Sequence, residues 1–202
     1  SIEVGDAETS VTTERYQTKI KHLPVEDFPL IPAVEDGSLV AIAASDLKEV
    51  LDSVAFAAST SETQPEISGI SMRFEGGKLT ATATDRYRLG EMSIRLQTTD
   101  DRAGEVPNRS IAELSRMLAG VEGNVGLNIS ATQMALTIAD TYMVTRLIDG
   151  QYPEYAQIIP NESGTVINLQ HKDLLSALKT SGIFSRGAGS ITMNFNPENQ
   201  SI

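Results

Sequence analysis

The chain has 202 residues, 40% of them hydrophobic and 21% charged, which is the composition of a globular protein with a full core. Its net charge of −11 argues against a surface that is basic throughout and leaves open a locally positive lining. It contains no cysteine, which excludes disulfides, thiolate zinc sites and cysteine nucleophiles. No stretch approaches the ~18 apolar residues of a membrane-spanning helix, and the N-terminus lacks the pattern of a signal peptide.

Two segments follow the same pattern at a spacing of about 130 residues, which is the size of one modest domain. Each has a strand, a short turn, an acidic residue beside an aromatic one, and an Ile-Pro ending. The first segment covers residues 18–32 and the second covers residues 145–160. This repeat is the main organisational signal, and it predicts a complete domain between the two segments.

Between these segments, the sequence predicts one strand, one helix and three further strands. The first strand covers residues 39–43, and the helix after it has apolar residues at the spacing of one buried face. Alternating apolar residues then predict strands over residues 70–74, 78–84 and 89–96, the first two joined by a tight Gly-Gly turn. The apolar residues of the helix are Leu47, Val50, Leu51, Val54, Ala55 and Ala58.

The same order of elements then occurs a second time. A short strand near Val106 precedes a helix that ends at Gly120, and strands follow over residues 124–130, 133–138 and 141–148.

A third unit begins with the same pattern near the end of the chain. It opens with a strand over residues 165–169 and a leucine-bearing helix that ends before Gly182, and one more strand covers residues 190–196.

When the first two halves are aligned, Thr84-Asp85 corresponds to Ala139-Asp140.

These repeated β-α-β-β-β units predict an α+β fold with antiparallel sheets. Each unit has one helix to cover one sheet face, so two units can share a core. Three such domains joined edge to edge would form a curved strip with sheets outside and helices lining the inner face, and a closed strip is a ring.

The sequence contains no constellation for catalysis. His22 and His171 are far apart, and residues 187–189 read as a turn because they lack the rest of a phosphate-binding fingerprint. We therefore expect no catalytic residue, no metal site and no cofactor.

One dense cluster of charged and aromatic residues lies at residues 84–89, at the junction of two strands. Two arginines and a tyrosine beside apolar residues would frame a groove for a peptide or a phosphate. An edge turn whose charged residues face water explains the same spacing equally well.

Three stretches, in the same order, resemble the bacterial sliding clamps, the beta subunits of DNA polymerase III. The central stretch is Thr82-Ala83-Thr84-Asp85-Arg86-Tyr87-Arg88-Leu89. Upstream, residues 67–70 and 74–79 also fit this family, and downstream so do residues 146–160.

The resemblance implies a head-to-tail ring dimer with three domains in each subunit. Residues 1–34 then match the C-terminal part of clamp domain 1, residues 38–162 the complete clamp domain 2, and residues 163–202 the N-terminal part of clamp domain 3. Because the ring interfaces of the family lie in domains 1 and 3, we do not expect this fragment to close a ring by itself.

The implied function is that of a cytoplasmic processivity factor, a non-catalytic subunit of the DNA polymerase III holoenzyme. The full-length ring would encircle double-stranded DNA without reading its sequence, and would tether the DNA polymerase III alpha subunit, the clamp loader and other proteins with a clamp-binding motif. The alternative from another class is a secreted or cell-surface β-rich module that binds a protein or a glycan.

The family receives short peptides in a groove, and apolar, arginine and tyrosine side chains suit that chemistry. Gln157 stands where many relatives have an arginine, which removes a positive charge from the groove rim. The matching positions are Ile67, Thr84, Arg86, Tyr87, Arg88, Leu89, Pro153, Gln157 and Ile158.

The family also faces DNA with its helices. Acidic residues on the same helices keep the positive excess small, so any DNA contact should be weak and salt-sensitive, and solvated helix faces remain an open alternative. The matching basic residues are Lys48, Arg109, Arg116, Lys172 and Lys179.

Overall fold

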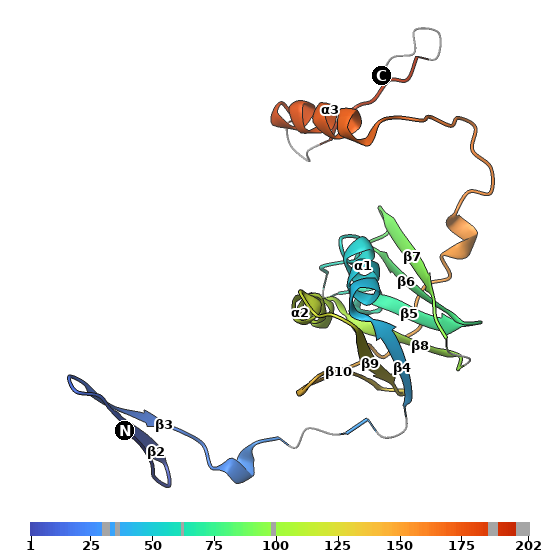
Figure 1. Ribbon diagram of the computed structural model, residues 1–202. Coiled ribbons are helices and arrows are strands. Elements are labelled where there is room, and N and C mark those ends of the chain that lie inside the picture. The colour runs from blue at the N-terminus through green and yellow to red at the C-terminus, as the bar shows by residue number, and fades with distance from the viewer. Residues whose placement is uncertain (30–32, 35–36, 62, 98–99, 186–189, 197–202) are drawn as a thin grey trace. The chain divides into compact units, whose positions relative to one another are not determined.

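The computed structural model describes residues 1–29, 33–34, 37–61, 63–97, 100–185 and 190–196 (Figure 1). The chain divides into two compact units, Ser1–Pro153 and Glu154–Ile202. The first unit begins with a three-stranded antiparallel sheet and the short 3-10 helix η1 (Val25–Asp27). The strands of this sheet are β1 (Ile2–Val4), β2 (Glu8–Thr12) and β3 (Gln17–Lys21).

The rest of the first unit consists of two β-α-β-β-β halves, as the sequence predicts. The first half contains β4 (Ser38–Ala43), α1 (Ala44–Ala55), the 3-10 helix η2 (Pro65–Ile67), β5 (Gly69–Glu75), β6 (Lys78–Thr84) and β7 (Leu89–Arg95). The second half contains β8 (Arg102–Pro107), α2 (Asn108–Leu118), β9 (Asn124–Ile129), β10 (Gln133–Ile138) and β11 (Thr141–Arg146). The predicted α+β class and the predicted repeat are both confirmed.

The two halves exchange their first strands. One four-stranded sheet has the order β11-β10-β9-β4 and the other has the order β7-β6-β5-β8. Leu39 of β4 therefore pairs with Asn128 of β9, and Ser71 of β5 pairs with Glu105 of β8. Each half is thus completed by a strand from the other half, which joins the two into a single domain.

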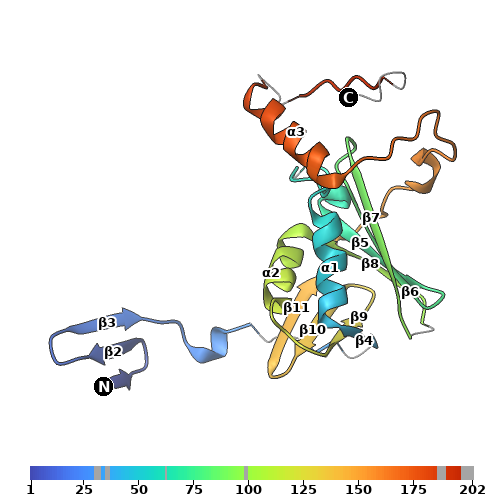
Figure 2. The same ribbon diagram turned by 45° about the horizontal axis from the view of Figure 1, so that its top comes forward.

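The helices α1 and α2 lie side by side and pack against the sheets (Figures 1 and 2). Their apolar residues recur at helical spacing, so each helix turns one stripe into the core. In α1 these are Leu47, Val50, Leu51 and Val54, and in α2 they are Ile111, Leu114 and Leu118, all at most 2% exposed. One continuous core therefore lies under both helices.

The turn that carries residues 84–89 is longer than the corresponding turn of the second half. Gly76 and Gly77, between β5 and β6, have φ values of +57° and +71°, as a two-residue turn with two left-handed positions requires. The β10–β11 turn is also short, because Ile138 pairs with Thr141. The β6–β7 turn is longer: Thr84 pairs with Leu89, which leaves residues 85–88 outside the ladder.

The second unit contains the 3-10 helix η3 (Ala156–Ile158) and α3 (His171–Ile183). The predicted helix is confirmed, but the strands predicted over residues 165–169 and 190–196 are not formed. A strand needs a neighbour that accepts and donates its backbone hydrogen bonds along its length, and within these two segments only the single residue Asn196 takes part in a bridge. The predicted turn at residues 187–189 and the first Ile-Pro ending at residues 31–32 lie outside the described residues.

Candidate functional site

The β6–β7 turn is held by hydrogen bonds of its own first two side chains. Thr84 Oγ1 donates to the carbonyl oxygen of Arg88 at 2.9 Å and accepts from the backbone N–H of Arg86 at 3.1 Å. Asp85 accepts from the backbone N–H groups of Tyr87 and Arg88 at 3.0 Å each. These bonds fix the path of the backbone and leave the Tyr87 side chain 98% exposed at the tip.

Asp85 also binds the side chain of Arg88. The Nε of Arg88 donates to Asp85 Oδ2 at 3.1 Å. Hydrogen bonds from the backbone N–H groups of Arg88 and then Tyr87 lower the pKa of the Asp85 carboxyl below its ordinary value. Asp85 is therefore ionised at neutral pH and orients the Arg88 guanidinium at the surface.

The last turn of α1 approaches the same arginine. The Cζ of Arg88 lies 5.6 Å from the centre of the Phe56 ring, at the C-cap of α1. The two elements are close because Gly90 has no side chain: a Cβ there would lie 3.3 Å from Val54 Cα. The site is thus built from the end of α1 as well as from the turn.

Arg86 connects the turn to the segment before η2. Its φ of +75° lies in the left-handed region that non-glycine residues rarely adopt. With the Gln64 amide oriented so that its oxygen faces Arg86, that oxygen accepts from the two terminal nitrogens of the guanidinium at 2.9 and 3.2 Å. This pair joins the turn to the segment that leads into Ile67.

The segment that leaves β11 runs past η2 and β8. The backbone N–H of Ile148 donates to the carbonyl oxygen of Glu105 at 2.8 Å, and a Cβ on Gly150 would lie 3.7 Å from Glu66 Cβ. Glu105 is 8% exposed, and its carboxylate accepts a hydrogen bond from the backbone of Tyr152. Burial, and to a lesser degree the charge of Glu66, raises the pKa of the Glu105 carboxyl.

The predicted groove residues differ in exposure. Ile67 and Thr84 are buried, at 1% and 7% exposed, so they support the site from below. Arg86, Tyr87, Arg88 and Pro153 are exposed and Leu89 is half-buried. Gln157 and Ile158 belong to η3 in the second unit, where the Ile158 side chain is 70% exposed.

Phe56 and Gln64 were not predicted from the sequence as residues of this site. Phe56 follows the buried positions of α1 but is itself 56% exposed. An aromatic residue outside the apolar stripe of the helix is the sequence feature that could have pointed to it. Gln64 lies in a polar stretch that carries no comparable signal.

The predicted DNA-facing residues of the first unit differ in their charge partners. Lys48 Nζ lies 2.5 Å from Asp52 Oδ2, and Arg116 lies 2.6 Å from Glu113. Among the residues that the structure describes, no ion pair joins Arg109 to an acidic side chain. Lys172 and Lys179 lie exposed on α3 in the second unit.

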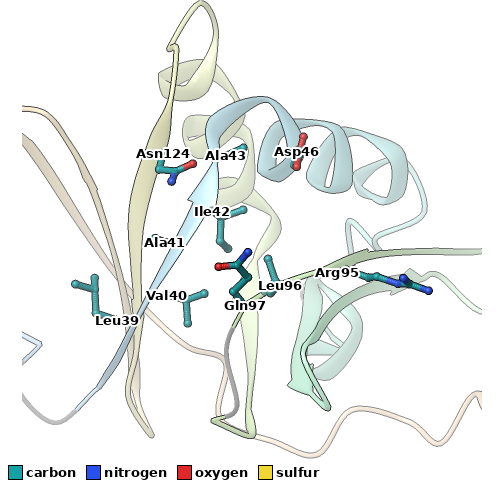
Figure 3. Close-up of a pocket in the computed structure, with 10 residues that line it drawn as sticks. All are labelled: Leu39, Val40, Ala41, Ile42, Ala43, Asp46, Arg95, Leu96, Gln97 and Asn124. Carbon is teal, nitrogen blue, oxygen red and sulfur yellow. The ribbon is translucent and has the colours of Figure 1, made fainter.

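A pocket of about 400 Å³ lies beside β4 (Figure 3). The close-up shows Val40 and Ile42 on β4 and Leu96 and Gln97 on the segment after β7. The complete lining is Leu39, Val40, Ala41, Ile42, Ala43, Asp46, Arg95, Leu96, Gln97 and Asn124. It includes none of the predicted groove residues, so this pocket is separate from the β6–β7 turn.

Within the described ranges, no three His, Asp or Glu side chains gather as a metal site. In the same ranges, no helix has the length and apolar character to span a membrane.

The comparisons agree with one another. A family model for the DNA polymerase III beta subunit, central domain, matches residues 41–154. The beta sliding clamp of Bacillus subtilis (strain 168) is 30% identical over 180 residues, which cover 88% of this chain and 48% of that protein. The crystal structure of the DNA polymerase sliding clamp from Bacillus subtilis has a TM-score of 0.86 at 28% identity, over 93% of this chain and 50% of that one.

A sliding clamp from Pseudomonas aeruginosa, solved bound to griselimycin, has a TM-score of 0.82 at 26% identity and covers 90% of this chain and 50% of that one. Two β-α-β-β-β halves that exchange their first strands therefore form the fold of a sliding clamp. The chain belongs to the DNA polymerase III beta subunit family, and its residues 41–154 are the central domain of that family. It spans about half the length of the relatives that it matches.

Proposed function

We propose that the whole protein is the processivity factor of a bacterial replicative DNA polymerase III. As a ring of two subunits it encircles double-stranded DNA in the cytoplasm, and it tethers the polymerase by raising its effective concentration at the DNA. It is itself non-catalytic. The match of residues 41–154 to the family's central domain carries this proposal. The same match leaves the alternative of a secreted or cell-surface binding module without support.

The proposed organisation follows the repeat. Residues 1–34 form the C-terminal part of clamp domain 1, residues 38–162 form clamp domain 2, and residues 163–202 form the N-terminal part of clamp domain 3. The repeated order of a strand, a connecting segment and a short 3-10 helix supports this division, because β3 is followed by η1 and β11 by η3.

The proposed groove for partner peptides is built on the β6–β7 turn. Leu89 and Pro153 offer apolar surface, and Ile67 and Thr84 lie buried beneath. Arg88 provides hydrogen-bond donors for peptide carbonyl groups or acidic side chains. Partners of this class are the polymerase alpha subunit, the clamp loader and other proteins with a clamp-binding motif. Gln157 and Ile158, which lie in the second unit, are proposed as groove residues from the family resemblance alone.

The proposed DNA-facing surface consists of the helices. It acts through charge without reading sequence, and the ion pairs of Lys48 and Arg116 reduce its positive potential. We therefore propose weak and salt-sensitive contacts, with Arg109, Lys172 and Lys179 as further members.

Binding of a fluorescent pentapeptide, Gln-Leu-Ser-Leu-Phe, tests the groove. We expect saturable binding by the chain and strong loss in the variants Arg88→Ala and Leu89→Asp. Two matched controls lie elsewhere on the sheets: Arg73→Ala, an exposed arginine of β5, and Leu39→Asp, a leucine of β4 that is 73% exposed. Equal loss in the variants and in their controls would overturn the assignment of the groove to the turn.

A further inference from the structure

Phe56 is an exposed aromatic residue beside the proposed groove. It caps the C-terminal end of α1 and is 56% exposed, whereas Val54, two residues before it, and Ala57, directly after it, are fully buried. A phenylalanine in this position exposes apolar surface that the core does not use. Instead, the guanidinium carbon of Arg88 lies 5.6 Å from the centre of the Phe56 ring, which is the distance of a cation–π contact.

The position of the ring is set by the packing of α1 against β7. Gly90 of β7 approaches so closely that a Cβ would lie 3.5 Å from Phe56 Cε1 and 3.6 Å from Ala57 Cβ. The backbone of β7 at Gly90 therefore lies beside the Phe56 ring, and the Arg88 guanidinium lies over that ring.

The Arg88 guanidinium is thus restrained by two different groups. Asp85 Oδ2 accepts from Nε at 3.1 Å, and the Phe56 ring lies below the guanidinium carbon. The hydrogen bond to Asp85 uses only the Nε of Arg88, so the two terminal nitrogens of the guanidinium take no part in it. A long side chain that is ordered before binding loses less conformational entropy when a ligand arrives.

We propose that Phe56 is a positioning residue of the peptide groove. It holds the Arg88 guanidinium in the orientation in which the terminal N–H groups bond an incoming peptide. This inference rests on the proposed function of the groove.

The binding test uses Phe56→Leu and Phe56→Tyr, each made with Arg88 present and with Arg88→Ala. With Arg88 present, we expect Phe56→Leu to weaken pentapeptide binding about two- to five-fold, the range of an exposed cation–π contact, and Phe56→Tyr to retain it. With Arg88→Ala, Phe56→Leu should change the remaining affinity by less than about 1.5-fold, since the two side chains then no longer couple. Equal weakening in both backgrounds would mean that the ring contacts the peptide directly, and would overturn the proposal.

A second readout needs no peptide. The NMR signal of the Arg88 Nε–H proton should lie upfield in the unmodified chain and move downfield in Phe56→Leu, because the ring current is lost. An unchanged signal would overturn the proposal even if the groove binds. If the signal moves but the unmodified chain binds no pentapeptide, the proposed groove itself is wrong, and the role of Phe56 in it falls with it.

Discussion

The hydroxyl of Ser115 on α2 donates a hydrogen bond of 2.5 Å to Asp52 Oδ1 on α1, so one short polar contact joins the helices of the two halves. Lys48 Nζ donates to the same pair, at 2.5 Å to Asp52 Oδ2 and 3.1 Å to Ser115 Oγ. The two repeats are therefore connected by polar side chains on their surface as well as by the shared core.

Replacing Ser115 with alanine should lower the free energy of unfolding by about 0.5–1 kcal/mol. Hydrogen bonds to charged groups contribute more when buried, but the Asp52 side chain is 50% exposed and water replaces part of the loss. Denaturant unfolding measures the difference. Ser45→Ala is the control, because Ser45 Oγ bonds Asp46 within the same helix and does not connect the halves. An equal cost in both variants would contradict the connecting role of Ser115.

The same network should make stability depend on pH. The hydrogen bond from Lys48, and then that from Ser115, lowers the pKa of the Asp52 carboxyl in the folded chain. The unfolded chain then binds more protons, so the contribution of Asp52 is present above its unfolded pKa and is lost as the pH falls through its folded pKa. We expect Asp52→Asn to destabilise the chain at pH 7 and to have less effect at pH 3. A loss that is equal at both pH values would contradict this.

The left-handed backbone at Arg86 should favour glycine over alanine. Both Arg86→Gly and Arg86→Ala remove the contact with Gln64, so the difference between them isolates the backbone at φ +75°. We expect the glycine variant to be more stable by about 1 kcal/mol, because a Cβ is disfavoured in this region. Ala139, at φ +47°, provides a second case in which Ala139→Gly should stabilise the chain. Thermal or denaturant unfolding would refute the argument if alanine were equal or better at position 86.

Glu105 should destabilise the folded chain as the pH rises. Burial raises the pKa of its carboxyl, so the folded chain binds more protons than the unfolded chain between the two pKa values. Stability from this group is present below the unfolded pKa and is lost as the pH rises through the folded pKa. Glu105→Gln removes this titration. The stability of the variant relative to the unmodified chain should therefore be greater at pH 7 than at pH 4. Unfolding curves at both pH values measure this, and an unchanged difference would contradict it.

Arg109 should contribute more to DNA binding than Lys48. The Lys48 charge is paired with Asp52, whereas Arg109 has no acidic partner among the described residues. Arg109→Ala should weaken binding of a DNA duplex at low salt and reduce the slope of log K against log salt by at most about one. Lys48→Ala should have a smaller effect. Fluorescence anisotropy over a salt series measures both variants, and a larger effect of Lys48→Ala would contradict the account.

Local patterns predicted the elements between β4 and β11 well, whereas β1 and β2 at the start of the first unit were not predicted. The bounds of β6 and β10 match the predicted strands because apolar residues alternate between defined turns. The exchange of β4 and β8 between the halves was not predictable, since strand partners are chosen by contacts between distant residues. For the same reason the strands expected over residues 165–169 and 190–196 failed: their own pattern is strand-like, but pairing depends on a neighbour.

The candidate site was predictable in part. The charged and aromatic turn is visible as a run of residues, and its place between two strands follows from the alternation around it. The contact between Arg88 and Phe56 joins a turn to a helix end that lies far away in the sequence. No local spacing encodes such a contact, because it depends on the close approach of Gly90 to α1.

The most direct test of the central claim is a map of the pentapeptide on the isotope-labelled chain by backbone amide chemical shifts. We expect the largest shifts at residues 84–90 and at Phe56, with little change along residues 39–43 beside the separate pocket. Shifts concentrated along residues 39–43 and Gln97, or no shifts at saturating peptide, would contradict the claim that partner peptides bind at the β6–β7 turn.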